Sequence, residues 1–224
     1  MKQLAAMVGI LVVLFIGAGA HVCIPANMNT LPDLVDKTLP AIVELRPGFA
    51  GWMGAGVLIS DDGWLVTAKH VVEDQDVMIA TMIDGVKYMS TTIIVGPNND
   101  IAILKIDIED APHVGLSGVY PRLGESVYVV GHPLGVLNTV SSGIVSNIHR
   151  NGSSFGVDLI QVDAEITHGN SGGGLFDMQG RLVGIVVGGT VFYTGIEANL
   201  AVPIARGREL LEKYRRQEIA AGQN

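Results

Sequence analysis

Three side chains in this sequence could together form a nucleophilic catalytic group, and they occur in the order histidine, aspartate, serine. His70 follows an apolar run, Asp100 follows two asparagines, and Ser171 lies in a glycine-rich segment, residues 168–174. An imidazole can accept the proton of a serine hydroxyl, while a buried carboxylate holds the imidazole in one tautomer and stabilises its cation. Taken singly, each residue also fits an ordinary role in a turn or at a strand end.

The glycines around Ser171 bear on the same question. Glycine lets the backbone adopt positive φ and turn its amides toward a bound carbonyl oxygen. A glycine-rich loop with one serine is a weak signal by itself, since many such loops are only hairpin turns. The interpretation therefore depends on the base and the acid elsewhere in the chain.

Short β-type runs separated by turn signals must position these residues. A stretch rich in proline, glycine and acidic residues, residues 107–124, divides the runs into two groups of about six. The predicted runs are Ala41–Leu45, Ala55–Ser60, Trp64–Thr67, Val77–Met82, Tyr88–Val95, Ile101–Ile106, Ser126–Gly131, Asn138–Ile148, Gly156–Asp163, Gly173–Phe176, Leu182–Val187 and Glu197–Val202.

This spacing predicts an all-β fold of two six-stranded antiparallel β-barrels. We expect the first barrel over residues 41–115 and the second over residues 116–203. Residues 204–224 are expected to form a short C-terminal helix and tail, with Leu210, Leu211 and Tyr214 on one side of the helix.

The N-terminal residues predict export. Residues 4–20 are uncharged and apolar, which is typical of a cleaved signal peptide or of an uncleaved signal anchor over residues 1–23. Both interpretations place the remainder outside the cytoplasm, either secreted, periplasmic or tethered to a membrane. Residues 24–40, which contain three prolines, read as a linker. Cys23 is the only cysteine, so we expect a free thiol.

Charge and ligand patterns exclude other classes. The formal net charge is −8 with only 14 Lys and Arg residues, which disfavours a nucleic-acid-binding protein. No group of His, Cys and Asp has metal-ligand spacing, so we expect no metal. Protein or peptide partners are the remaining expectation.

Several separate motifs together resemble the trypsin-like, chymotrypsin-fold serine proteases, and more closely the protease domain of the HtrA (DegP-type) family. The matching segments are Thr67–Val72, Asp100–Ile106, Gly131–Gly135, Ile160–Ala164, Gly169–Gly173 and Leu200–Pro203. The resemblance covers residues 40–203, and the 21 residues after Pro203 are too few for the PDZ domain that most HtrA-type proteins carry.

The resemblance implies that His70 and Asp100 come from the first barrel and Ser171 from the second, meeting in the cleft between them. The amides of Gly169 and Ser171 would form the oxyanion hole. It also implies a serine endopeptidase acting on unfolded or extended proteins in extracytoplasmic quality control or processing, without a cofactor, and a homotrimer as one assembly. The alternatives are a catalytically silent binding module of the same fold and an esterase acting at the same site.

The residues that should bind substrate depart from the family pattern. Glu165 stands where the floor of the primary pocket is expected, and it either favours basic side chains or turns away into a hydrogen-bond network. Asn199 replaces a glycine that would leave the pocket open, which indicates a shallow or polar site. Val187, Gly188 and Gly189 are the expected edge for pairing with an extended substrate.

Overall fold

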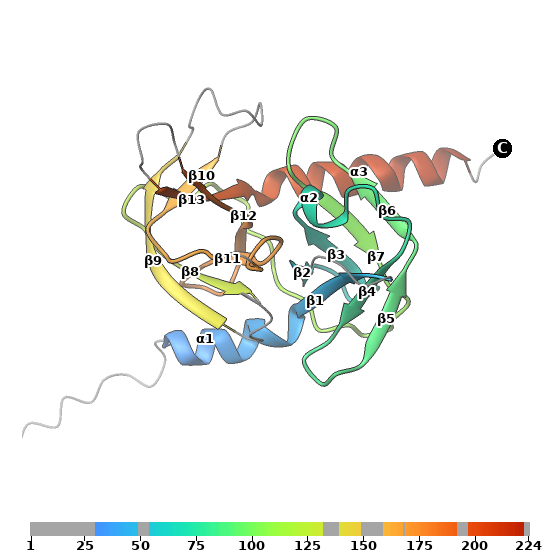
Figure 1. Ribbon diagram of the computed structural model, residues 1–224, viewed down its shortest axis with the longest axis horizontal. Helices are drawn as coiled ribbons and strands as arrows, with labels where there is room; N and C mark the ends of the chain where they lie inside the picture. Colours follow the sequence, from blue (N-terminus) through green and yellow to red (C-terminus); the bar gives the residue numbers. More distant parts are fainter. Residues whose placement is uncertain are drawn as a thin grey trace, which may run out of the picture.

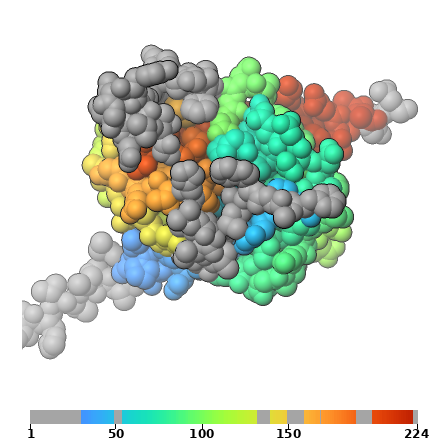
Figure 2. Space-filling model, viewed as in Figure 1, coloured from blue at the N-terminus to red at the C-terminus, as the bar shows by residue number. Residues whose placement is uncertain are grey.

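The computed structural model describes residues 30–48, 54–131, 139–148, 159–167, 169–191 and 197–221. Two barrel-like sheets lie side by side, and a long C-terminal helix runs from the second across the first (Figure 1). In the space-filling view the two halves touch, with orange residues of the second barrel beside teal residues of the first (Figure 2). The predicted all-β fold with a C-terminal helix is confirmed.

The first sheet has seven strands in the order β5-β4-β1-β2-β3-β7-β6. Their bounds are β1 Ile42–Pro47, β2 Gly54–Leu58, β3 Trp64–Thr67, β4 Met78–Thr81, β5 Lys87–Ser90, β6 Thr92–Val95 and β7 Ala102–Lys105. All residues of β2 and β3 are buried, so these two central strands carry the core of this half.

The seventh strand arises because the predicted run Tyr88–Val95 is divided in two. β5 pairs with β4, whereas β6 pairs with β7 on the opposite edge of the sheet. The chain turns at Thr91, where the Ser90 hydroxyl donates to the Thr92 carbonyl oxygen at 3.2 Å. A run of β-forming residues conceals this turn because it contains no glycine or proline.

The second sheet is a closed six-stranded barrel in the order β10-β13-β12-β11-β8-β9. Its strands are β8 Ser126–Gly131, β9 Thr139–Asn147, β10 Ile160–Val162, β11 Gly174–Asp177, β12 Leu182–Val191 and β13 Glu197–Pro203. Branched side chains such as Val129, Val145 and Ile160 fill its interior. The strand number of this barrel is as predicted.

Part of the predicted linker is a helix instead. α1 spans Leu31–Thr38 and continues as a 3₁₀ turn, η1 Leu39–Ala41. Pro32 is compatible with a helix here because the first turn needs no amide hydrogen from it. Asp33 accepts hydrogen bonds from the Thr30 amide at 2.9 Å and from the Thr30 hydroxyl at 2.7 Å, and these bonds lower the pKa of Asp33.

Helix α1 packs on the second barrel although it leads into the first. Leu34 is fully buried, and a Cβ at Gly180, in the β11–β12 turn, would lie 3.4 Å from its Cδ2. Thr38 and Tyr128 of β8 place their hydroxyl oxygens 3.4 Å apart. The N-terminal end of the described chain is thereby fixed to the opposite half of the molecule.

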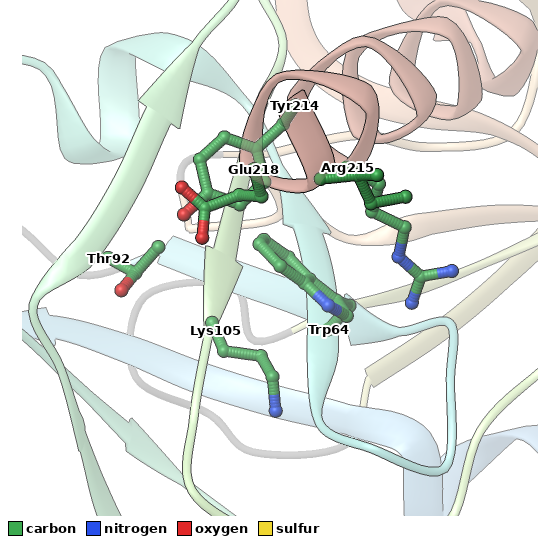
Figure 3. A pocket seen from close by; sticks show the side chains of 7 residues that line it. Trp64, Thr92, Lys105, Tyr214, Arg215 and Glu218 are labelled. Carbon is green, nitrogen blue, oxygen red and sulfur yellow. The ribbon is translucent and has the colours of Figure 1, made fainter. Parts of the chain in front are cut away.

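The last helix, α3 Ile204–Ala221, packs in the reverse sense, since it leaves the second barrel and covers the first. Trp64 of β3 and Tyr214 meet edge to face with ring centroids 5.4 Å apart. Around this pair lies a pocket lined by Thr92, Lys105, Arg215, Glu218 and Ile219 (Figure 3). Most of the expected helix and tail over residues 204–224 is therefore helical.

The predicted signal segment over residues 1–23, the tether over residues 4–20 and Cys23 lie outside the described residues. In the part of the chain that is described, none of the helices has both the length and the apolar character needed to cross a bilayer.

Candidate active site

His70 and Asp100 are brought together by two neighbouring strands of the first sheet. His70 lies in the short helix α2 Lys69–Val72, which follows β3, and Asp100 lies just before β7. Thr67 of β3 pairs with Ala102 of β7, so the two segments leave the sheet at the same edge.

Asp100 binds His70 through both of its carboxylate oxygens. Oδ2 lies 2.7 Å from the ring Nδ1, and Oδ1 accepts the His70 backbone amide at 2.9 Å. The carboxylate is an acceptor when ionised, so Nδ1 carries the hydrogen and Nε2 of the neutral ring has a free lone pair. Asp100 is only 8% exposed, whereas the His70 side chain is 44% exposed. The arrangement leaves an oriented base on the surface of the first barrel.

Ser171 lies in a tight loop pinned to β12. The Gly172 amide donates to the Val186 carbonyl oxygen at 2.7 Å, and the Val186 amide donates back to Gly173 at 2.9 Å. Gly169 and Gly172 have φ of +95° and +83°, values that favour glycine. These bonds and dihedral angles fix the backbone on both sides of the serine.

The same loop also touches the first barrel. The Ser171 carbonyl oxygen accepts the Ala55 amide of β2 at 2.8 Å. A Cβ at Gly54 would lie 2.9 Å from that oxygen and 2.7 Å from Cγ2 of Val71, the neighbour of His70. The structure thus brings the Ser171 loop against the segment that carries His70, although no hydrogen bond joins the Ser171 hydroxyl to the His70 ring among the described residues.

Two backbone amides of the loop are unused within the described part of the chain. Neither the Gly169 nor the Ser171 amide donates to a described acceptor, whereas Asn170, Gly172 and Gly173 between and after them all do. Two free amides flanking one residue are a suitable pair of donors for an oxyanion.

The predicted substrate edge lies beside Ser171. Gly188 has φ +110°, and a Cβ there would lie 3.8 Å from the Ser171 hydroxyl oxygen. Val187 forms a bulge, because Val186 pairs with Ala201 and Gly188 with the preceding Leu200. The bulge thus lies in the part of β12 that approaches the serine.

Asn199 and Glu165 occupy different environments. Asn199 pairs with Gly189 across β12 and β13, and its Nδ2 donates to the Ala164 carbonyl oxygen at 2.8 Å. The Glu165 side chain is exposed, and its carbonyl oxygen accepts the Ser141 hydroxyl at 2.7 Å. Asn199 therefore bridges β12 and the segment before Ser171.

Within residues 30–221, excluding the undescribed gaps, no three or more His, Cys, Asp or Glu side chains are grouped so as to hold a metal ion.

Residues 54–185 match the trypsin-like peptidase domain, which is more than half of the chain. This chain belongs to the trypsin-like peptidase family. The matched region contains His70, Asp100 and Ser171.

Similarity to individual trypsin-like peptidases extends beyond the domain match. The chain is 34% identical over 166 residues to a probable periplasmic serine endoprotease, DegP-like, of Chlamydia pneumoniae, covering 71% of this chain and 34% of the relative. It is 33% identical over 208 residues to serine protease HTRA4 of Mus musculus, covering 85% and 42%. The chain thus spans less than half the length of these relatives.

Solved trypsin-like structures agree with the fold. The serine endoprotease from Yersinia pestis superposes with a TM-score of 0.71 at 32% identity, covering 82% of this chain and 65% of that one. The HtrA-type protease AlgW with tripeptide gives a TM-score of 0.71 at 32% identity, covering 80% and 61%.

The sequence did not predict the contacts of the Ser171 loop with Ala55, Thr67 and Val186. The one available signal is Gly172, because a residue without a side chain next to a nucleophile indicates close approach of another backbone. Which backbone approaches depends on the docking of the two barrels, and local sequence does not encode that.

Proposed function

We propose that this chain is a serine endopeptidase in which Ser171 is the nucleophile, His70 the general base and then acid, and Asp100 the residue that orients His70. The observation that carries the proposal is the pair of hydrogen bonds that Asp100 accepts from the ring and the backbone amide of His70, which leaves Nε2 as an acceptor. The next residue, Val71, and the Ser171 carbonyl oxygen both lie within 3 Å of the Cβ position of Gly54. The similarity to serine endoproteases supports it.

The reaction is acyl transfer in two halves. Ser171 Oγ bonds to the peptide carbonyl carbon as its proton passes to His70 Nε2, and Asp100 stabilises the imidazolium. The tetrahedral species then breaks its C–N bond, and His70 protonates the leaving amine. Water attacks the acyl group with His70 again as the base, which releases the carboxylic acid and restores the Ser171 hydroxyl.

The amides of Gly169 and Ser171 are the proposed oxyanion donors, since neither has another described acceptor. Donors that are fixed before the reaction stabilise the developing charge without reorganisation, and loss of one costs about 10²–10³ in rate.

Extended protein segments are the proposed substrates. Val187, Gly188 and Gly189 lie at the bulged part of β12 beside Ser171, where an extended peptide can pair with the strand. Asn199 pairs with Gly189, and its side-chain amide binds the Ala164 carbonyl oxygen, so we expect a shallow primary pocket that takes small side chains. Glu165, exposed next to Ala164, adds a negative charge near this pocket, and Glu165→Gln measures its contribution.

We further propose that the enzyme acts outside the cytoplasm, which the word periplasmic in the name of the DegP-like relative supports, and that it serves protein quality control or processing. A homotrimer and a tether through residues 4–20 remain predictions from the sequence. Cell fractionation and N-terminal sequencing of the exported protein test the location and the cleavage of the leader.

The direct test uses the full chain and Ser171→Ala. We expect the wild type to react with a fluorophosphonate probe and to degrade casein, and the variant to do neither while retaining its fold. A folded wild type that neither reacts nor cleaves would overturn the enzyme and favour the binding module. Labelling with cleavage of small esters but not of casein would favour the esterase.

A further inference from the structure

Ala55 of β2 is held by both of its backbone polar groups, one bonded to the Ser171 loop of the second barrel and one to β3 of its own sheet. Its amide donates to the Ser171 carbonyl oxygen at 2.8 Å, and its carbonyl oxygen accepts the Thr67 hydroxyl at 2.6 Å. The ladder between β2 and β3 includes Val57 and Leu58 but not Ala55. Ala55 therefore bonds to the Thr67 hydroxyl of β3 and to the Ser171 carbonyl oxygen instead of to backbone groups of β3.

The three segments are packed without space between them. Thr67 is fully buried, and a Cβ added at Gly172 would overlap both the Ala55 carbonyl oxygen and the Thr67 hydroxyl. The left-handed φ of Gly172 brings the loop backbone onto this hydrogen bond. Movement of the Thr67 hydroxyl is therefore transmitted to the residue next to Ser171.

Thr67 is also placed to affect the histidine and the aspartate. It is the last residue of β3, three positions before His70, and it pairs with Ala102, two positions after Asp100. Thr67 thus lies close to the segments that carry His70 and Asp100, and against the Ser171 loop.

We propose that Thr67 is a positioning residue that fixes the Ser171 hydroxyl relative to the His70 imidazole. The inference rests on the proposed endopeptidase function. Without the hydroxyl, the Ala55 carbonyl oxygen loses its buried donor, and the contact between β2 and the loop can shift. Displacement by about 1 Å is enough to lower a rate by up to about 10²-fold.

The test compares Thr67→Val, which keeps the shape but loses the donor, with Thr67→Ser, which keeps the donor. We expect Thr67→Val to lower kcat and the fluorophosphonate labelling rate by about tenfold or more with KM almost unchanged. Thr67→Ser should restore both to within about twofold. Thr81→Val on β4, a partly buried threonine of the same sheet, is the matched control and should retain wild-type rates.

A purely structural role predicts a different result, namely a lower thermal midpoint with unchanged kcat per folded molecule. That result for Thr67→Val would overturn the proposal. If Thr67→Val does not fold, Thr67→Cys carries the test, since it keeps the volume and has only a weak donor. We then expect its kcat to lie clearly below that of Thr67→Ser, and equal values would overturn the proposal. An inactive, folded wild type would instead refute the proposed function.

Discussion

Asp100 holds His70 by two hydrogen bonds, one to the ring Nδ1 at 2.7 Å and one to the backbone amide at 2.9 Å. The second bond means that the carboxylate fixes the helix start as well as the ring. The carboxylate is nearly buried, so water cannot replace either bond easily.

Asp100→Asn is expected to lower kcat by about 10³–10⁴-fold, because an amide at this position favours the wrong tautomer of the ring. The fluorophosphonate labelling rate should fall with it, whereas circular dichroism should remain that of the wild type. A folded variant with kcat within tenfold of the wild type would show that Asp100 does not orient His70 for the reaction.

Gly188→Ala should weaken substrate use, because φ of +110° is strained for any residue with a Cβ and the new methyl group points toward Ser171. We expect kcat/KM for peptides to fall about tenfold, with a stability loss of about 1–2 kcal/mol. Gly118→Ala is the control, since φ there is not positive and the added Cβ meets no neighbour. Equal losses in both variants would contradict the role of Gly188.

Asn199→Gly should deepen the primary pocket. We expect the ratio of kcat/KM for a leucine over an alanine before the scissile bond to rise by about tenfold, as measured with a matched peptide pair. Loss of the bond to Ala164 also frees the segment before Ser171, so the measurement is the ratio of the two peptides within each variant. An unchanged ratio would show that Asn199 does not limit the pocket.

The phenol of Tyr128 makes the free energy of unfolding depend on pH in the alkaline range. Burial raises the pKa of its phenol, the hydrogen bond with Thr38 opposes this, and the Asp177 charge adds to it. Above pH about 10 the phenol loses its proton in the unfolded chain but keeps it in the folded chain. The free energy of unfolding therefore falls as the pH rises from about 10 through the raised pKa of the folded state. Urea unfolding of Tyr128→Phe should show a shallower decline above pH 10 than the wild type. Parallel declines would contradict this assignment.

Leu34→Ala tests the attachment of α1 to the second barrel. Leu34 is fully buried, so we expect a loss of about 2–5 kcal/mol in the free energy of unfolding. Leu31→Ala, on the same helix but only partly buried, should cost clearly less. Chemical denaturation of both variants measures the difference, and equal costs would show that α1 is not anchored through Leu34.

The strands were predictable because their runs are apolar and separated by turn residues, and the second barrel matches the expected number of strands. The turn at Thr91 and helix α1 were not predicted, since the first lacks a glycine or proline and the second has at its second position a proline, a residue that also marks linkers. In the site, residue type and order indicate His70, Asp100 and Ser171. The bond between Thr67 and Ala55 joins neighbouring strands beyond their ladder, and no local pattern indicates it.

Each end of the described chain packs on the barrel to which it does not belong by sequence, α1 on the second and α3 on the first. Neither half therefore buries its own surface when it is separated from the other. A cut in the connector between the barrels would leave two fragments that each lack a covering helix, so we expect the molecule to unfold as a single cooperative unit.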